Sequence, residues 1–144
     1  MTNFLIDTNG MVAAVSEWHQ DHERAAKEIH RRLDSGEDMV LAAHSLVEAY
    51  SVLTRLPPPR RLPAVSAVEV LEASFGAASV VTLEPGEYRA LLRGAPGAGI
   101  SGGRIYDAII AECAFKADAA ALVTFNARHF LAFARRGIQV VVPS

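Results

Sequence analysis

Two patterns of hydrophobic and polar positions alternate along the chain. Short apolar runs predict buried strands, and segments with apolar residues every three or four positions predict helices. The strands are expected at residues 4–6, 39–42, 79–83, 121–124 and 138–142. The helices are expected at residues 18–33, 44–56, 63–74, 85–92 and 104–116, with a further short helix between the last two strands.

Glycine and proline residues support several of these boundaries. Gly36 follows the first predicted helix, and three prolines at 57–59 end the second. Pro85 opens the fourth, where Glu84 and Glu87 favour the positive end of the helix. The local signals and the hydrophobic pattern therefore predict the same order of elements.

Strands that alternate with helices, and that consist of continuous apolar runs, indicate a parallel sheet covered on both faces. We therefore expect an α/β fold, a three-layer α/β/α sandwich around a central sheet of about five strands. A length of 144 residues suits a single domain spanning 1–144. In such sheets the ligand site lies beyond the carboxyl ends of the strands, near the switch in strand order.

Composition narrows the class of protein. The sequence is 51% hydrophobic and 21% charged, which is typical of a compact globular domain. The net charge of −2 gives no fold-wide positive field that would attract nucleic acid. A lone cysteine, Cys113, excludes an internal disulfide and is expected to be a buried thiol. Without a membrane-spanning apolar run or a signal-peptide pattern, a cytoplasmic protein with no membrane contact is expected.

Four polar residues lie where the strand-end rule places a site. Asp7 follows the first strand, Glu48 lies early in the helix after the second, Asp107 opens the helix before the fourth, and Asn126 follows the fourth. Right-handed crossovers bring such positions to one end of the sheet. Carboxylates that converge there repel one another and raise their own pKa values unless a cation neutralises them. Oxygen ligands suit Mg²⁺ or Mn²⁺, and the absence of a Cys/His cluster disfavours zinc.

Each of these residues also has a purely structural interpretation. Asp7 and Asn126 could cap the helices that follow them. Glu48 could close a capping box with Ser45 at the start of its helix. Asp107 could simply favour the helix dipole, although an acid in so apolar a helix is costly to bury without a partner. The prediction of a site therefore depends on the four residues occurring together.

Four segments extend the pattern: residues 5–9 (Leu-Ile-Asp-Thr-Asn), 48–57 (Glu-Ala-Tyr-Ser-Val-Leu-Thr-Arg-Leu-Pro), 102–108 (Gly-Gly-Arg-Ile-Tyr-Asp-Ala) and 123–130 (Val-Thr-Phe-Asn-Ala-Arg-His-Phe). With these segments in this order, nearly the whole chain resembles PIN-domain proteins, and more narrowly the VapC-type toxins of bacterial toxin–antitoxin systems. The resemblance implies a PIN-like sandwich and a Mg²⁺- or Mn²⁺-dependent endoribonuclease.

The resemblance also implies roles for individual residues. Asp7, Glu48 and Asp107 become the site acids, with Asp7 and Asp107 holding the metal and Glu48 completing the pocket or binding a second ion. Asn126 stands where many PIN domains carry a fourth Asp, which lowers the negative charge. Thr8 is similar to residues that orient the acids or the attacking water.

Three more residues join this set. Thr124 is similar to Thr8 in its implied orienting role. Arg104 and Arg128 flank the acids in sequence and could bind RNA phosphates, or could be solvated surface residues. The bound metal is expected to lower the pKa of a water and to neutralise charge growing on the phosphate. The resemblance implies in-line attack that leaves a 5′-phosphate.

Partners are implied in the same way. The family implies a homodimer and a cognate VapB-type antitoxin whose tail blocks the pocket. The substrate is RNA, and a structured tRNA or rRNA loop is a reasonable hypothesis because sequence-specific recognition reads unstacked bases. The alternative is a catalytically weak or inactive PIN-like domain that binds RNA or an antitoxin without cleavage, which Asn126 keeps open.

Other interpretations are less well supported. Residues 97–102 match the dinucleotide-binding pattern GxGxxG, but a predicted helix precedes them and Asn126 stands where an acid is needed. A flexible loop beside the active site explains these glycines better. A phospho-accepting signalling domain would need paired acids after the first strand and a lysine after the last, and neither is present. Packing or solvated roles are favoured for four histidines: His19, His22, His44 and His129.

Overall fold

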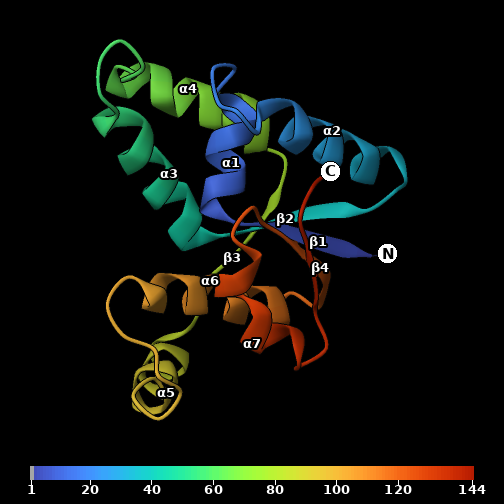
Figure 1. Cartoon of the computed structure of the whole chain (residues 1–144), viewed down its shortest axis with the longest axis vertical. Coiled ribbons are helices and arrows are strands. Elements are labelled where there is room, and N and C mark those ends of the chain that lie inside the picture. The colour runs from blue at the N-terminus through green and yellow to red at the C-terminus, as the bar shows by residue number, and fades with distance from the viewer. Residues whose placement is uncertain (1) are drawn as a thin grey trace.

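The computed structural model describes residues 2–144, and this part of the chain forms one parallel sheet of five strands in the order β3-β2-β1-β4-β5 (Figure 1). The strands are β1 (Asn3–Ile6), β2 (Asp38–Ala42), β3 (Ser79–Val81), β4 (Ala119–Val123) and β5 (Gln139–Val141). The chain builds outward from β1 to β3, then returns to the other side of β1 to add β4 and β5. The order of the strands therefore reverses between β1 and β4.

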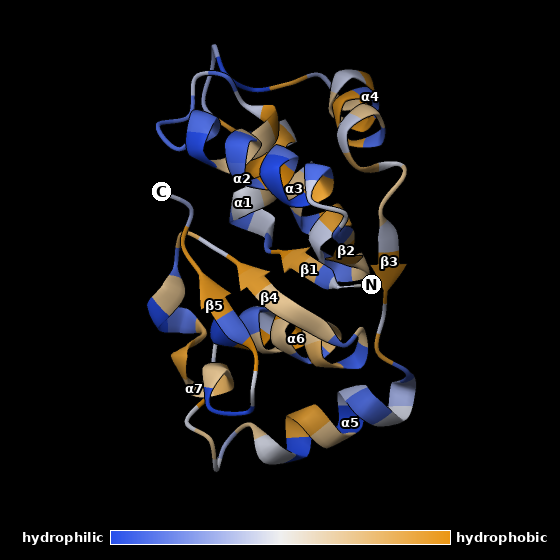
Figure 2. Ribbon diagram, turned by 90° about the vertical axis from the view of Figure 1, so that its right-hand side faces the viewer, coloured by the Kyte–Doolittle hydropathy of each residue, from blue (hydrophilic) through white to orange (hydrophobic). Residues whose placement is uncertain are grey.

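Helices cover both faces of this sheet, as Figures 1 and 2 show. On one face lie α1 (Thr8–Val15), α2 (His22–Asp34), α3 (Ala43–Arg55) and α4 (Ala64–Phe75). On the other lie α5 (Pro85–Gly94), α6 (Arg104–Lys116) and α7 (Leu131–Ala134), the last preceded by the short 3₁₀ turn η1 (Ala127–His129). The predicted three-layer α/β/α sandwich around a parallel sheet is confirmed.

The core is divided in two by the sheet because successive strand residues point to opposite faces. Phe4 and Ile6 of β1 are fully buried against the α1–α4 layer, whereas Leu5 between them is fully buried in the α5–α7 layer. Leu41 and Val40 of β2 divide between the two layers in the same way. Burial on both faces explains why the strands are continuous apolar runs, which appear as hydrophobic arrows between the helices in Figure 2.

The largest difference from the sequence prediction concerns the first helix. Residues 18–33 were expected to form one helix, but α1 occupies Thr8–Val15, turns follow, and α2 begins at His22. Trp18 lies in those turns, 41% exposed, with the guanidinium of Arg60 4.5 Å from the centre of its ring. The helical spacing between Trp18 and His22 is therefore coincidental.

The remaining predicted helices and strands are all present, with ends that differ by one or two residues. The helix predicted at 104–116 matches α6 at both ends, and β4 begins two residues earlier than expected. Glu84 and Glu87 form a capping box at the start of α5. Cys113 is buried in α6, and burial raises the pKa of its thiol to about 11, so the expected buried thiol is confirmed.

The switch between β1 and β4 brings together two points that are distant in sequence. The backbone N–H of Asp7 donates to the carbonyl oxygen of Val123 at 3.1 Å, so the end of β1 is bonded to the end of β4. The carboxyl end of β2 lies on the other side of β1, and α3 begins there without an intervening loop. This edge of the sheet is where a ligand site is expected. Among residues 2–144, no helix is long and apolar enough to cross a membrane.

Candidate functional site

Asp7 connects the end of β1 to the start of α1 and is only 3% exposed. Its Oδ1 accepts a hydrogen bond from the backbone N–H of Gly10 at 2.8 Å, which caps α1. Its Oδ2 accepts a hydrogen bond from the Thr124 hydroxyl at 2.6 Å, across the switch point of the sheet. The capping interpretation of Asp7 is therefore correct, and the same side chain also lines a cleft with other acids.

The environment of Asp7 disfavours the ionised form of its carboxyl group. The pKa of Asp7 is raised to about 6, chiefly by burial. The hydrogen bonds from Thr124 and Gly10 partly offset this effect, and the negative charges of Asp107 and Glu48 add to it. The repulsion expected between converging acids is present, although burial is the larger cause. A cation beside Asp7 would favour its ionised form.

Gly10 is the residue that allows this approach. A Cβ atom at position 10 would lie 2.6 Å from Cγ1 of Ile6 and 3.0 Å from Oδ1 of Asp7. Both neighbours are buried, so neither can move away cheaply. Asp7 with the two groups that bond to it, Thr124 and the Gly10 N–H, is called the floor of the cleft below.

Two further acids stand beside the floor, on helices from opposite layers, and are called the walls. Glu48 comes from α3 and is 29% exposed; Asp107 comes from the first turn of α6 and is 25% exposed. The cleft has a volume of about 190 Å³. Its lining residues are Asp7, Thr8, Asn9, Glu48, Val52, Arg55, Gly103, Tyr106, Asp107 and Ile110.

The alternative role of Glu48 in a capping box is wrong. The N-cap of α3 is Ala42, so Ser45 lies inside the helix rather than at its cap. Ser45 is fully buried and its hydroxyl accepts a hydrogen bond from the Thr8 hydroxyl at 3.0 Å. Thr8 thus lines the cleft, but its side chain bonds to Ser45 and not to an acid. Glu48 is left free to face the cleft.

Two histidines contact the walls, which corrects the packing or solvated roles expected for them. Nδ1 of His129 lies 3.2 Å from Oδ2 of Asp107. Nε2 of His44 lies 3.6 Å from Oε2 of Glu48, and its ring stacks on that of Tyr106 with centroids 4.9 Å apart. The spacing of His44 and Glu48, four residues apart on one helix, was a signal for the second contact. No local spacing indicates the first.

The other two histidines have the expected packing roles. Nδ1 of His22 lies 2.9 Å from the carbonyl oxygen of Ala13, and Nδ1 of His19 accepts a hydrogen bond from the backbone N–H of Asp21 at 3.0 Å. Both contacts are local to the turns between α1 and α2.

Asp107 is less buried than Asp7, but burial still raises its pKa, and the charge of Glu48 adds to this effect. The neighbouring His129 and Arg104 act in the opposite direction, and Nε of Arg104 lies 4.0 Å from Oδ2 of Asp107. Asp107 therefore has two neighbours that lower its pKa, His129 and Arg104, and one carboxylate, Glu48, that raises it.

Four residues predicted from sequence do not line the cleft: Thr124, Asn126, Arg104 and Arg128. The backbone N–H of Asn126 donates to the Thr124 hydroxyl at 2.9 Å, which helps to hold the hydroxyl that bonds to Asp7. Asn126 occupies the N-cap position of η1, as the cap interpretation expects, but its side chain makes no capping hydrogen bond. Arg128 is exposed at the start of the segment that follows β4.

A divalent cation fits the chemistry of this cleft. Within residues 2–144, no three Asp, Glu, His or Cys side chains are placed to ligate one ion together. Mg²⁺, however, commonly keeps several waters and binds through only one or two carboxylates. A buried carboxylate with a raised pKa, facing two more carboxylates across a small cleft, supplies such ligands.

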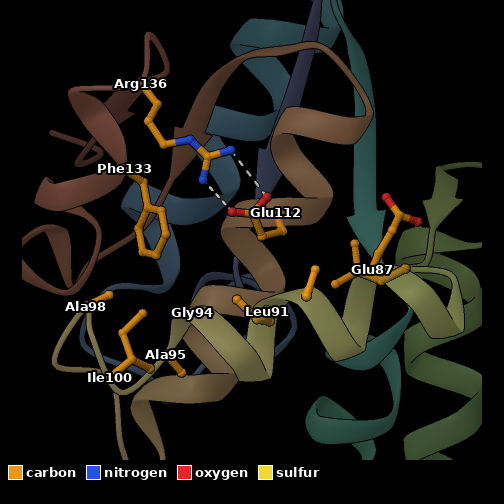
Figure 3. A pocket seen from close by; sticks show the side chains of 11 residues that line it. Glu87, Leu91, Gly94, Ala95, Ala98, Ile100, Glu112, Phe133 and Arg136 are labelled. Carbon is orange, nitrogen blue, oxygen red and sulfur yellow. Dashed lines mark hydrogen bonds and ion pairs between the residues drawn. The ribbon is translucent and has the colours of Figure 1, made fainter.

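A larger cleft, of about 410 Å³, lies elsewhere, between α5, α6 and α7 (Figure 3). Most of its lining is apolar, including Phe133. Both acids that line it are already paired, Glu112 with Arg136 and Glu87 with Lys116. Because its acids are paired with Arg136 and Lys116, this cleft lacks a buried carboxylate without a basic partner, such as Asp7 in the smaller one.

The family model of the PIN domain matches residues 4–136, which include the whole of the cleft. This chain belongs to the PIN-domain family. As a PIN domain it is 36% identical to Ribonuclease VapC40 of Mycobacterium tuberculosis over 134 residues, covering 93% of this chain and 94% of that protein. It is 33% identical to Ribonuclease VapC27 of the same organism over 138 residues, covering 96% and 88%.

A solved structure agrees on the fold of this PIN domain. It superposes on a chain of VapBC2 from Rickettsia felis, crystallised with a DNA fragment from its promoter, with a TM-score of 0.71. The match covers 99% of this chain and 100% of that chain, at 15% sequence identity. The predicted resemblance to VapC-type ribonuclease toxins is confirmed by the two curated relatives, and the PIN-like fold by the structure.

The site predicted from sequence lacked six lining residues of this PIN domain: Asn9, Val52, Arg55, Gly103, Tyr106 and Ile110. Arg55 lies seven residues after Glu48, and residues seven apart fall on nearly the same face of a helix. That spacing was therefore a usable signal once Glu48 had been placed in the site. Asn9 lies in the first turn of α1, a helix that the hydrophobic pattern did not reveal.

Proposed function

We propose that this chain is the toxin of a VapBC-type toxin–antitoxin module and hydrolyses RNA phosphodiester bonds with the help of Mg²⁺ or Mn²⁺. The observation that carries the proposal is the buried carboxylate of Asp7 at the switch point of the sheet, facing Glu48 and Asp107 across one cleft. The identity to VapC ribonucleases over more than nine-tenths of the chain supports the same reaction.

Asp7 and Asp107 would hold the cation, and Glu48 would complete the pocket or bind a second ion. A cation bound there supplies charge that neutralises the developing negative charge on the phosphate and lowers the pKa of a water molecule. Asp7 would be the fixed ligand, because both its oxygens are held by hydrogen bonds. Asp107 and Glu48 are more exposed and would adjust to the ion and the substrate.

The surrounding residues of this chain would orient these groups. Thr124 holds Oδ2 of Asp7, and the backbone of Asn126 holds the Thr124 hydroxyl in turn. His129 restrains Asp107 from the solvent side. Arg104 and Arg128 would contact RNA phosphates from outside the cleft. Release of a 5′-phosphate remains a prediction from the family.

The proposed partners follow from the same assignment. A VapB-type antitoxin would cover the cleft and block access of RNA to the acids. We also expect a homodimer in the cytoplasm, where the RNA substrate is present. A structured tRNA or rRNA loop would suit a small cleft, because unstacked bases allow a single strand to reach its floor.

One observation favours a second function, binding of RNA or an antitoxin without cleavage. Position 126 is Asn rather than the fourth Asp of many PIN domains, and it does not line the cleft. The weaker negative charge would hold a second cation less firmly. Cleavage that depends on metal distinguishes the two functions.

The test is incubation of the purified, antitoxin-free protein with total cellular RNA and Mn²⁺ or Mg²⁺. Discrete fragments are expected, and they should disappear with EDTA and with Asp7→Asn but persist with Asp34→Asn, an exposed acid on the far end of α2. Circular dichroism would verify that each variant is folded. Folded wild-type protein that binds metal but cuts no RNA would favour the binding-only function.

A further inference from the structure

Arg55 extends the cleft along α3. Glu48, Val52 and Arg55 line the cleft from one face of this helix, at spacings of four and three residues. Seven residues of α-helix span about 10.5 Å, so Arg55 stands two turns away from the wall carboxylate of Glu48. The cleft is therefore lined by acids and, from the last turn of α3, by Arg55.

Arg55 is the arginine that lines the cleft, and its guanidinium is not paired with a carboxylate, whereas five of the twelve arginines in the sequence are. Arg32 is bonded to Glu28 and Glu37, and Arg136 is paired with Glu112. Across residues 2–144, no carboxylate lies within 4.0 Å of the exposed guanidinium of Arg55. Its planar group of hydrogen-bond donors is therefore free to bind a ligand.

The charge of Arg55 determines which ligand suits it. Among the described residues that line the cleft, three are carboxylates and Arg55 alone is basic. A free guanidinium favours two parallel hydrogen bonds to a planar or tetrahedral oxyanion, and phosphate is its usual partner in nucleic acids. A strand whose cut phosphate lies at the acids has a neighbouring phosphate within reach of Arg55.

We propose that Arg55 binds an RNA phosphate next to the one that is cut, so that the strand runs along α3 from Arg55 to the acids. This inference rests on the proposed function, because it takes RNA as the substrate. Arg55 acts by holding the strand in register over the acids and does not contact the reacting atoms. It also offsets part of the repulsion between the acidic cleft and a polyanion.

The test measures RNA binding separately from cleavage. A fluorescein-labelled, random-sequence RNA of about 12 nucleotides, within the usual site sizes for single strands, is titrated with the full chain in Ca²⁺ and followed by anisotropy over a range of KCl concentrations. Gels of the same samples show whether any RNA has been cut. The variants are Arg55→Gln, Arg55→Lys and, as a matched control, Arg89→Gln, an exposed arginine on α5 that does not line the cleft.

Arg55→Gln is expected to raise the Kd about 10-fold at low salt. It should also reduce the slope of log Kd against log salt by about 0.7, the value for one lost phosphate contact on a single strand. Arg55→Lys should keep the salt slope, since it keeps the charge, while losing part of the affinity. Arg89→Gln should match the wild type. In cleavage assays, Arg55→Gln should raise KM and leave kcat nearly unchanged.

The other outcomes overturn the inference, the proposed function or both. An unchanged Kd and salt slope for Arg55→Gln, with native folding by circular dichroism, would show that Arg55 binds no phosphate. A fall in kcat with an unchanged KM would place Arg55 at the cut phosphate instead of a neighbouring one. If the wild type binds RNA but cuts none in Mg²⁺ or Mn²⁺, the proposed function fails but the binding data still decide the role of Arg55. If the wild type does not bind RNA at all, both proposals fail.

Discussion

The floor and the walls of the cleft are built by different means. The floor carboxylate of Asp7 is almost completely buried, and hydrogen bonds from the N-terminus of α1 and from the residue after β4 hold both of its oxygens. The wall carboxylates of Glu48 and Asp107 stand on helices, about a quarter exposed, with imidazoles 3.2 to 3.6 Å away. The floor is therefore set by strand register, whereas the walls depend on how two helices pack and can adjust to a ligand.

The largest expected effect is on the stability of the folded protein, which the buried, ionised carboxylate of Asp7 lowers. The pKa of Asp7 is about 6 when folded against 3.8 as its ordinary value, so the folded state binds more protons than the unfolded state between these pH values. Stability is therefore lost as pH rises from about 4 through 6, by roughly 3 kcal/mol in the absence of metal. Urea unfolding in EDTA from pH 4 to 8 should show this loss, and Asp7→Asn should abolish it.

Comparison with a variant of an exposed acid makes this measurement specific. At pH 8 in EDTA, Asp7→Asn should be more stable than the wild type, whereas Asp34→Asn should change stability by less than about 0.5 kcal/mol. Added Mg²⁺ should stabilise the wild type and have little effect on Asp7→Asn. Equal stabilities of wild type and Asp7→Asn at pH 8 would mean that the ionised carboxylate of Asp7 does not destabilise the folded protein.

The next effect concerns the hydroxyl that holds the floor. Thr124→Val removes the 2.6 Å hydrogen bond to Oδ2 of Asp7 while keeping the shape of the side chain, so the pKa of Asp7 should rise further. Loss of a group that orients a metal ligand typically costs 10- to 100-fold, so initial rates of RNA cleavage should fall by about that factor. Thr124→Ser keeps the hydroxyl and should retain most activity. A Thr124→Val protein with wild-type rates would contradict a fixed floor.

The smallest effect is expected at the walls. His129→Asn removes the imidazole that contacts Asp107, and the pKa of Asp107 should rise because one neighbour that lowers it is lost. Partly exposed ion pairs contribute 1 kcal/mol or less, so the cleavage rate should fall by less than about 5-fold. Cleavage rates of His129→Asn and Thr124→Val, measured under the same conditions, would show whether the walls or the floor matter more. A larger loss from His129→Asn than from Thr124→Val would reverse the comparison between floor and walls.

The fold could be predicted largely from local patterns, with one clear failure. Buried strands and the apolar helix α6 stand out because glycine, proline and polar segments bound them. Helix α1 does not stand out, because it packs against α2, α3 and α4 and residues 10–15 are all small or apolar. A helix without a polar face has no amphipathic period to detect. The strand order depends on pairings between distant segments, which local patterns do not contain.

The acids of the site could be predicted because each follows a strand or begins a helix at the same edge of the sheet. Some of their contacts could not. The Ser45–Glu48 spacing suggested a capping box, but that motif works only at a helix start, and α3 begins earlier, directly after β2. The contact between His129 and Asp107 joins two elements separated by β4, so no spacing along the chain indicates it.

The reversal of strand order has a consequence for the synthesis of the protein. Asp7 is made before Thr124, which holds it and emerges from the ribosome 117 residues later. A nascent chain that ends before β4 has the first acids but neither the residue that locks the floor nor the strand that β1 pairs with at the switch point. Nuclease activity should therefore arise only after β4 and Thr124 have been made, so the ribosome translating this protein is not exposed to a half-made enzyme.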